Sequence, residues 1–254
     1  MLTGLLLTVA LLRLAASRTA WFDDFNEPLN DSRWLLVDAG GGFGNGELQY
    51  YRPQNAAVSN GTLKIHARLE PYSGHAYTSA KVITIESWTR GIFSVRARFS
   101  SARGTWPAAW LLPSREAFGS WPRSGEADVF ESVGFNRTFV RSTVHTEFVN
   151  GAFGPKQFGE VELDTAVWHV YSLLWNSSHL TFSVDGDVYY SFSKRQALRG
   201  NPPAVASWPF NRQFYLILNL AVGGNWGGAM GVDERAFSGA GQWLEVDWVS
   251  VEDA

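Results

Sequence analysis

Three carboxylic acids stand close together in one short segment of the chain. Successive side chains of a β-strand point to opposite faces, so Glu126 and Asp128 share one face, whereas Glu131 falls on the other. One extra residue at Val129 or Phe130, a β-bulge, would return Glu131 to the acidic face. The two Glu side chains, leaning toward each other, can then approach the ~5 to 5.5 Å that separates the nucleophile and the general acid of a retaining glycosidase.

Asp128 lies between the two Glu residues in this arrangement. It can accept or donate a hydrogen bond and so keep the proton affinities of its neighbours apart. Packing three carboxyls together raises the pKa of at least one, which supplies a protonated acid near neutral pH. The same spacing also fits a solvated acidic strand face or a cation site, so both alternatives stay open on spacing alone.

The elements that must position these acids are short and alternate apolar with polar residues. Each is rich in β-branched or aromatic residues, is bounded by Gly, Asn, Pro or Asp, and is predicted to be a strand. The Asp185-Gly186 pair indicates a hairpin, and the only helix suggested is a short one near Ser193–Leu198. The pattern predicts an all-β antiparallel sandwich in which one sheet face is open to a ligand. The predicted strands are Thr62–Ala67, Val82–Glu86, Ile92–Phe99, Ala127–Glu131, Val140–His145, Val170–Trp175, Leu180–Val184, Phe214–Val222 and Trp243–Val251.

Length and composition are those of a folded domain that needs no covalent staple. The chain has 254 residues, no cysteine, 45% hydrophobic and 18% charged residues, and a net charge of -3. A chain of this size buries enough surface to form a core without disulfides. The balance of charge and hydrophobicity excludes a disordered chain, a basic nucleic-acid binder and an electrostatic membrane binder. No linker or repeat interrupts residues 18–254, which we therefore expect to form one domain, acting as a monomer.

The first residues are typical of a secretory signal peptide. Met1–Ser17 is an apolar run that ends in small residues and is too short to span a bilayer. Arg13 interrupts it, so a short buried helix or an anchor is the alternative. Four Asn-X-Ser/Thr sequons agree with secretion. We expect an extracellular glycoprotein that begins near Arg18 and has no membrane association after signal removal. The sequons are at Asn30, Asn60, Asn136 and Asn176.

Two segments together resemble family 16 of the glycoside hydrolases, in its laminarinase-like branch of endo-β-1,3-glucanases. They are Trp106–Pro113 and Gly125–Glu131, and Pro209–Trp226 strengthens the likeness, which covers nearly all of the chain after the signal. The five-residue separation of the two Glu is similar to the bulged laminarinase motif, whereas lichenases and xyloglucan transglycosylases of the family usually have four. The resemblance implies a β-jelly roll of two curved sheets, with β-glucan bound in the concave cleft and cleaved inside the chain with retention.

The resemblance also implies a role for each acid. The family's nucleophile falls on Glu126, its assisting acid on Asp128 and its acid/base on Glu131. No cofactor is required for this chemistry. Laminarinases of the family often bind one structural calcium far from the cleft, and here Asp24 and Asp247 are the candidate carboxylate ligands.

Candidate substrate-binding residues surround the three acids in the sequence. The Trp residues among them are either sugar platforms or core, and those beside Pro or Gly turns are the better platform candidates. The Asn lies in a Gly-rich run that is expected to rim the cleft, or else serves a turn. The His either touches the sugar or is structural. The candidates are Asn45, Trp106, Trp110, Trp121, His145 and Trp226.

Two other functions remain open from the sequence. A non-hydrolytic β-glucan recognition protein has the same fold, but such relatives typically replace the motif acids, and all three are present here. A transglycosylase forms the same covalent intermediate and resolves it with a sugar hydroxyl in place of water. Spacing does not distinguish water from sugar as the acceptor.

Overall fold

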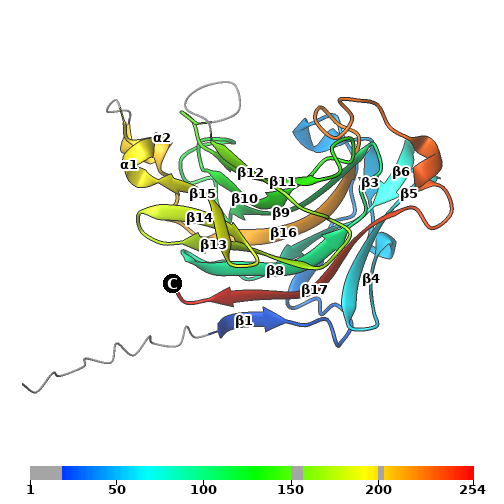
Figure 1. Ribbon diagram of the computed structural model, residues 1–254, viewed down its shortest axis with the longest axis horizontal. Coiled ribbons are helices and arrows are strands. Elements are labelled where there is room, and N and C mark those ends of the chain that lie inside the picture. The colour runs from blue at the N-terminus through cyan, green and yellow to red at the C-terminus, as the bar shows by residue number, and fades with distance from the viewer. Residues whose placement is uncertain (1–18, 150–156, 200–202) are drawn as a thin grey trace, which may run out of the picture.

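The computed structural model describes residues 19–149, 157–199 and 203–254, which form two β-sheets stacked face to face (Figure 1). This confirms the predicted all-β sandwich. The signal peptide predicted at Met1–Ser17 lies outside the described residues. Within them, no helix has the length and apolar character needed to cross a membrane.

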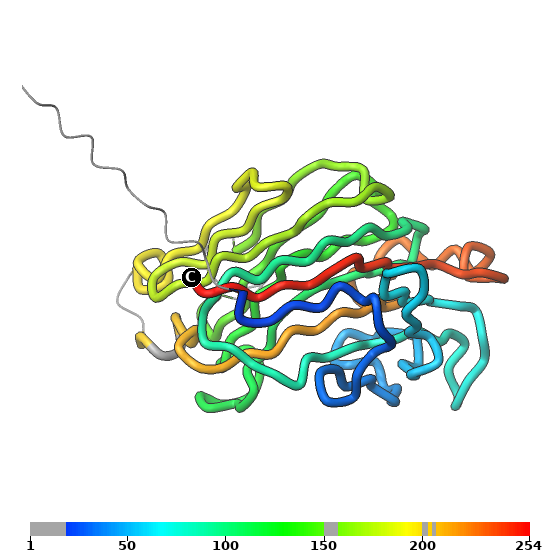
Figure 2. The backbone as a smooth tube through the Cα atoms, turned by 90° about the horizontal axis from the view of Figure 1, so that it is seen from below, coloured from blue at the N-terminus to red at the C-terminus, as the bar shows by residue number. Residues whose placement is uncertain are grey.

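The larger sheet has ten strands. β1 (Thr19–Asp23) runs beside β17, as Figure 2 shows, and β4 (Ala56–Ser59) pairs with β5. The pairing of β3 with β6 is parallel, while the other pairings of this sheet are antiparallel. The order of the remaining strands is β15 (Asp187–Ser193), β14 (His179–Val184), β13 (His169–Trp175), β8 (Gly91–Phe99), β17 (Gln242–Glu252), β5 (Thr62–Tyr72), β6 (His75–Ser79) and β3 (Gln49–Tyr51).

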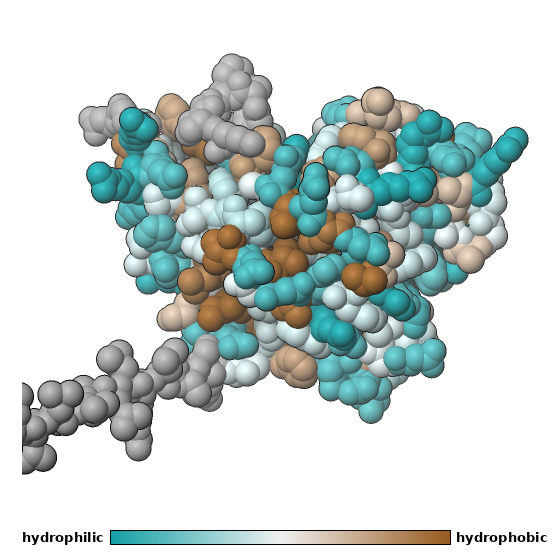
Figure 3. Space-filling model, viewed as in Figure 1, coloured by the Kyte–Doolittle hydropathy of each residue, from teal (hydrophilic) through white to brown (hydrophobic). Residues whose placement is uncertain are grey.

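The second sheet has seven strands, all paired antiparallel. In Figure 3 the molecule is notched at the edge of the view where this sheet lies. The three acids lie on its β10 strand. The strand order is β12 (Phe158–Glu162), β11 (Phe139–His145), β10 (Glu126–Glu131), β9 (Thr105–Pro113), β16 (Phe214–Val222), β7 (Lys81–Thr84) and β2 (Trp34–Leu36).

Helices are few and short in the described residues. The predicted short helix is α1 (Lys194–Ala197), which Ser193 and Leu198 cap. Its start is a capping box, in which Ser193 and Gln196 satisfy each other's backbone N–H groups. The other helical elements are α2 (Ala204–Ser207) and the 3₁₀ turns η1 (Gly42–Gly44), η2 (Pro53–Asn55) and η3 (Glu234–Phe237).

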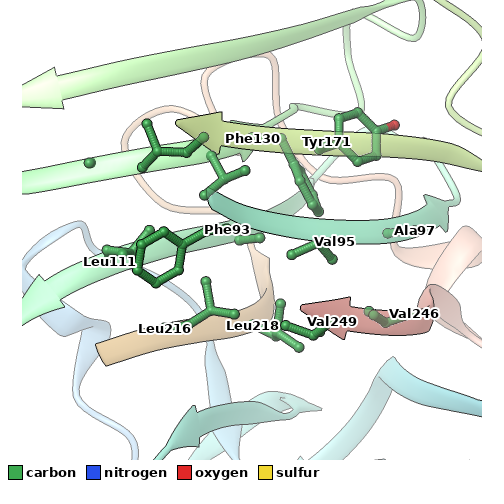
Figure 4. Close-up of a cluster of buried hydrophobic side chains, with 14 of the residues drawn as sticks. Phe93, Val95, Ala97, Leu111, Phe130, Tyr171, Leu216, Leu218, Val246 and Val249 are labelled. Atoms are coloured by element: carbon green, nitrogen blue, oxygen red, sulfur yellow. The ribbon is translucent and has the colours of Figure 1, made fainter. Parts of the chain in front are cut away.

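The hydrophobic core fills the space between the two sheets (Figure 4). Phe130 of β10 stacks on Phe99 of β8 at 5.5 Å and lies 4.4 Å from Tyr171 of β13, measured between ring centroids. All three side chains are fully buried. The inner face of β10 is therefore fixed by apolar packing across the sandwich, which leaves its outer face for polar side chains.

Candidate active site

The β10 strand carries the bulge that the spacing of its acids requires. Against β9, Asp128 and Phe130 pair with consecutive residues, so Val129 is the extra residue. The register with β11 also shifts between Asp128 and Glu131. Phe130 enters the core, while Glu126, Asp128 and Glu131 all line one cleft. The prediction of a bulge at Val129 or Phe130 is confirmed.

This cleft has a volume of about 830 Å³ and lies on the outer face of the seven-stranded sheet. Ala108 of β9 and Ala221 of β16 line it with small side chains, which leaves room above the sheet. All nine residues proposed for catalysis or substrate binding line the cleft. They are Asn45, Trp106, Trp110, Trp121, Glu126, Asp128, Glu131, His145 and Trp226.

Indole and hydroxyl groups fix the orientation of the two outer acids. Trp121 Nε1 donates to Glu126 Oε2 at 2.8 Å. Trp106 Nε1 donates to Glu131 Oε1 at 3.0 Å, and Thr143 Oγ1 donates to Glu131 Oε2 at 3.2 Å. The Glu126 side chain is only 14% exposed. Such sheltered, hydrogen-bonded carboxyls exclude the alternative of a solvated acidic strand face.

His145 faces the acids from the neighbouring strand β11, where it pairs directly with Glu126. Its Nε2 atom lies 3.3 Å from Asp128 Oδ2 and 3.7 Å from Glu126 Oε1. The ring centroids of His145 and Trp121 are 5.7 Å apart. The structure therefore brings His145, a candidate substrate-binding residue, next to the acids.

Burial raises the pKa of Glu126 to about 8 from an ordinary value of 4.5. Loss of hydration is the largest cause, and the negative charge of Asp128 adds to it. The adjacent His145 and the hydrogen bond from Trp121 act in the opposite direction. The state of Asp128 therefore controls how readily Glu126 ionises.

The other two acids are shifted in the same direction. Burial raises the pKa of Glu131, against the opposing effects of His145 and the hydrogen bonds from Trp106 and Thr143. Burial, and then the charge of Glu131, hold the pKa of Asp128 well above its usual range. All three pKa shifts favour the protonated form, because the three carboxyls are buried together.

The aromatic residues of the cleft belong to its wall and not to the sealed core. Trp121 is 55% exposed, and Trp106, Trp110 and Trp226 are half-buried. Trp106 and Trp226 meet edge to face, with ring centroids 5.6 Å apart. Trp110 donates from Nε1 to Asn219 Oδ1 at 2.7 Å. The alternative that these Trp residues only fill the core is thus excluded.

Beside the acids lies a polar network in which Asn45 is the only member that had been proposed as a site residue. Glu47 accepts hydrogen bonds from Asn45 at 3.3 Å, Gln49 at 2.7 Å and Tyr51 at 3.1 Å. Next to it, the Lys81 ammonium lies 4.8 Å from each of two aromatic ring centroids, and burial lowers its pKa. Glu47, Gln49 and Tyr51 are spaced two apart, which is the signal that places them on one strand face.

Arg141 is a second cleft residue that the sequence did not single out. Its guanidinium carbon lies 4.0 Å from the Phe158 ring centroid and 4.5 Å from that of Trp226. It also forms an ion pair with Glu160 at 2.6 Å. These contacts help to hold Trp226 against the cleft wall. No motif around Arg141 indicates this position, because the contacts come from three different strands or loops.

The proposed calcium ligands lie outside the cleft. Asp24 accepts a hydrogen bond from Asn26 Nδ2 at 2.7 Å. Asp247 forms an ion pair with Arg96, so its charge is already balanced. Neither belongs to a group of three or more ligating side chains among the described residues. A calcium site here remains a prediction that backbone carbonyl oxygens would have to complete.

Comparison with known proteins gives a consistent result. Residues 46–249 match the model of the family described as glycosyl hydrolases family 16. A β-glucanase of Rhodothermus marinus is 45% identical over 91% of this chain and 83% of its own length. A glucan endo-1,3-β-glucosidase of Cryptopygus antarcticus is 32% identical over 90% and 89%. The X-ray structure of the R. marinus laminarinase superposes with a TM-score of 0.88 at 42% identity, over 95% of this chain and 99% of that one.

Proposed function

The chain belongs to family 16 of the glycosyl hydrolases, and from this premise we propose that it is an endo-β-1,3-glucanase acting on laminarin-type glucan with retention. The observation that carries the proposal is the bulge at Val129, which puts Glu126, Asp128 and Glu131 on one face of β10. The cleft above them is lined with Trp faces of the kind that stack on sugar rings. The names of the relatives support β-1,3-glucan as the substrate.

In the first step, Glu126 attacks the anomeric carbon of the glucan. Trp121 holds Oε2, so Oε1 is the oxygen that forms the new bond. The glycosidic C–O bond breaks as Glu131 gives its proton to the leaving oxygen. The products of this step are a shortened glucan and a covalent glycosyl-enzyme on Glu126.

In the second step, a water molecule releases the sugar. Glu131 is now a carboxylate, held by Trp106 and Thr143, and takes a proton from the water as it attacks the anomeric carbon. The bond to Glu126 breaks, and both acids return to their starting states. Two inversions at one carbon give net retention.

Asp128 sets the protonation states that these steps require. Burial, and then the charge of Glu131, hold the pKa of Asp128 well above its usual range, which favours the protonated form of Asp128. A neutral Asp128 removes the negative charge that is the second cause of the high pKa of Glu126. Loss of that charge favours ionisation of Glu126, the nucleophile, and the raised pKa of Glu131 favours the proton that it donates.

Reducing-end release from laminarin, together with chromatography of the oligomers, tests the proposal. Hydrolysis should release reducing ends from the start, with internal cleavage seen as a rapid fall in polymer length. If longer oligomers appear with no net increase in reducing ends, the protein is a transglycosylase and not a hydrolase. Tight binding with no change in the polymer would assign a recognition protein.

Proton NMR of the first product tests retention separately. We expect the β-anomer to appear before mutarotation, because Glu126 attacks directly and leaves no place for a water on the opposite side of the sugar. If the α-anomer appears first, Glu126 is not the nucleophile.

We also propose that the protein is a secreted, monomeric glycoprotein. In support, Asn30, Asn60 and Asn136 are exposed. Asn176 is half-buried, and its Oδ1 accepts three hydrogen bonds from Ser178 and His179, so we expect it to be the least modified of the four. Intact-mass analysis of the chain from a eukaryotic host checks processing and glycans, and light scattering checks the monomer. An unprocessed chain without glycans would contradict the proposal of secretion.

A further inference from the structure

Glu126, Asp128 and His145 place three potential metal ligands around one point of the cleft. One ligand atom from each lies within 4.8 Å of the other two. In the part of the chain that the structure describes, no other group of three or more His, Cys, Asp or Glu residues does so. We propose that this triad binds a divalent transition-metal ion, with Zn²⁺ as the best match, and that the ion competes with glucan for the site.

The two distances from His145 to the carboxylate oxygens fit a tetrahedral ion. Zinc bonds to nitrogen and oxygen at about 2.0 to 2.2 Å, so neighbouring ligand atoms of a tetrahedral site stand about 3.3 to 3.6 Å apart. His145 Nε2 lies 3.3 Å from Asp128 Oδ2 and 3.7 Å from Glu126 Oε1. For the two pairs that include His145, a zinc ion therefore requires only shifts of a few tenths of an ångström, and the two carboxylate ligand atoms lie within 4.8 Å of each other.

An unsatisfied oxygen of Asp128 points independently to a ligand. Asp128 is 1% exposed, and its Oδ2 accepts no hydrogen bond. A buried carboxyl oxygen left without a partner is costly, and a metal ion would supply one as the carboxyl group releases its proton. This is the same oxygen that faces His145 Nε2, so the unsatisfied atom points at the centre of the triad.

The donor set selects the class of metal. One imidazole nitrogen with two carboxylate oxygens suits zinc and its neighbours, whereas calcium and magnesium prefer oxygen ligands alone. Glu126 can offer Oε1 while Oε2 stays bonded to Trp121. The fourth position opens into the cleft and is available to water or to a hydroxyl group.

The surroundings indicate reversible binding and not a resident metal. His145 Nδ1 is buried and has no hydrogen-bond partner, so nothing fixes the ring tautomer. Metal sites without such a partner bind about 10- to 100-fold more weakly. Because the ion would occupy Glu126 Oε1, it would block the nucleophile and inhibit hydrolysis competitively. This consequence for hydrolysis rests on the proposed function, whereas the binding itself does not.

Calorimetric titration of the full chain with ZnCl₂, after chelation and buffer exchange, tests the binding. We expect one zinc per chain for the wild type and at least a tenfold weaker affinity for His145→Ala and for Glu126→Gln. His179→Ala is the matched control, because this histidine is exposed at the start of β14 and is not a member of the triad. Equal affinities for wild type, His145→Ala and Glu126→Gln, or no zinc binding by the wild type, would overturn the proposal.

A measurement on the wild type alone covers the case in which the variants fail to fold. Co²⁺ in a tetrahedral site absorbs strongly in the visible range, whereas octahedral Co²⁺ absorbs weakly. We expect the strong absorption on adding Co²⁺ and its loss on adding laminarin or excess Zn²⁺. A purely octahedral spectrum would contradict the inference. So would a tetrahedral spectrum that does not change on adding laminarin, provided that the metal-free protein cleaves laminarin.

Kinetics separate this inference from the proposed function. Zinc should raise the KM for laminarin without changing kcat, and EDTA should reverse the effect. If zinc binds through His145 but the metal-free protein releases nothing from β-glucan, the proposed function fails and the metal site stands. If laminarin is cleaved and zinc leaves KM unchanged, the competition fails and the hydrolase assignment stands.

Discussion

At the scale of single residues, the two outer acids differ by what surrounds them. Glu126 has the Trp121 indole on one oxygen and His145 near the other, whereas Glu131 receives hydrogen bonds on both oxygens from Trp106 and Thr143. Two chemically identical side chains can take opposite roles when their environments separate their proton affinities. Each acid therefore has its own experimental signature.

Glu131→Gln should separate the acid step from the nucleophilic step. Without a proton donor, turnover of laminarin should fall by a factor of about 100 to 10,000. An aryl glycoside with a good leaving group needs no proton for the first step, so the loss there should be much smaller. Initial rates on both substrates, with Glu126→Ala inactive on each, provide the measurement. Equal losses on the two substrates would show that Glu131 is not the acid.

Glu126→Gln should stabilise the fold at neutral and alkaline pH. The folded pKa of about 8 lies above the ordinary 4.5, so the folded protein holds a proton that the unfolded chain has lost. Wild-type stability therefore falls as pH rises from about 4.5 to 8 and then levels off. We expect Glu126→Gln to raise the free energy of unfolding at pH 8 by about 2 kcal/mol, or Tm by about 4 to 8 °C. This gain is smaller than the full pKa shift implies, because the 14% exposed side chain of Glu126 retains some hydration.

Thermal unfolding at pH 4 and pH 8 checks this expectation. The gain should be near zero at pH 4, where Glu126 is protonated in both states. Glu162→Gln, at an exposed position in β12, serves as the control and should change Tm little at either pH. A gain that is the same at pH 4 and pH 8 would show that it does not come from ionisation of Glu126.

At the scale of elements, the bulge of β10 decides which face Glu131 occupies. Deleting Val129 leaves three residues between the outer acids, a separation of four positions, and the two-residue period of a strand still keeps both on the cleft face. We expect this variant to lose stability, since Val129 is 1% exposed, yet to cleave laminarin at least tenfold faster than Glu131→Gln. Rates normalised to the folded fraction from circular dichroism test this. Activity no greater than that of Glu131→Gln would show that the bulge itself is required.

β9 is an element that the sequence did not predict as a strand. Its Pro107 lacks the N–H that a central strand normally uses, which argues against a strand from pattern alone. In the structure the Pro107 carbonyl accepts a hydrogen bond from Ser132, while Leu220, its partner on β16, donates to Ala80. The missing donor therefore breaks no hydrogen bond between β9 and β16, and β9 can place Trp106 and Trp110 in the cleft.

At the scale of the whole molecule, the core between the sheets supports the cleft from behind. Phe130→Ala removes a ring that contacts β8 and β13, and should cost about 3 to 5 kcal/mol of unfolding free energy. Urea unfolding followed by circular dichroism and by Trp fluorescence should give one coincident transition at lower urea. Phe22→Ala is the control, because Phe22 is 46% exposed and should cost much less. Similar losses for the two variants would contradict the central role of Phe130.

The sequence by itself determined the fold class and singled out the three acids on which the proposed function rests. Alternation with period two, turn residues and the Asp185-Gly186 pair are local signals, so strand positions such as Phe214–Val222 followed from neighbouring residues alone. The bulge near Val129 also followed, because only an extra residue places Glu126 and Glu131 on one face.

Tertiary structure alone decided the partners of those acids. Trp106 to Glu131, Lys81 beside Glu47, and Arg141 against Trp226 join residues that are distant in the sequence. Such contacts depend on strand order and register, which no local period encodes. Burial likewise sets the high pKa values of the acids, and burial is known only when both sheets and the surrounding loops are in place.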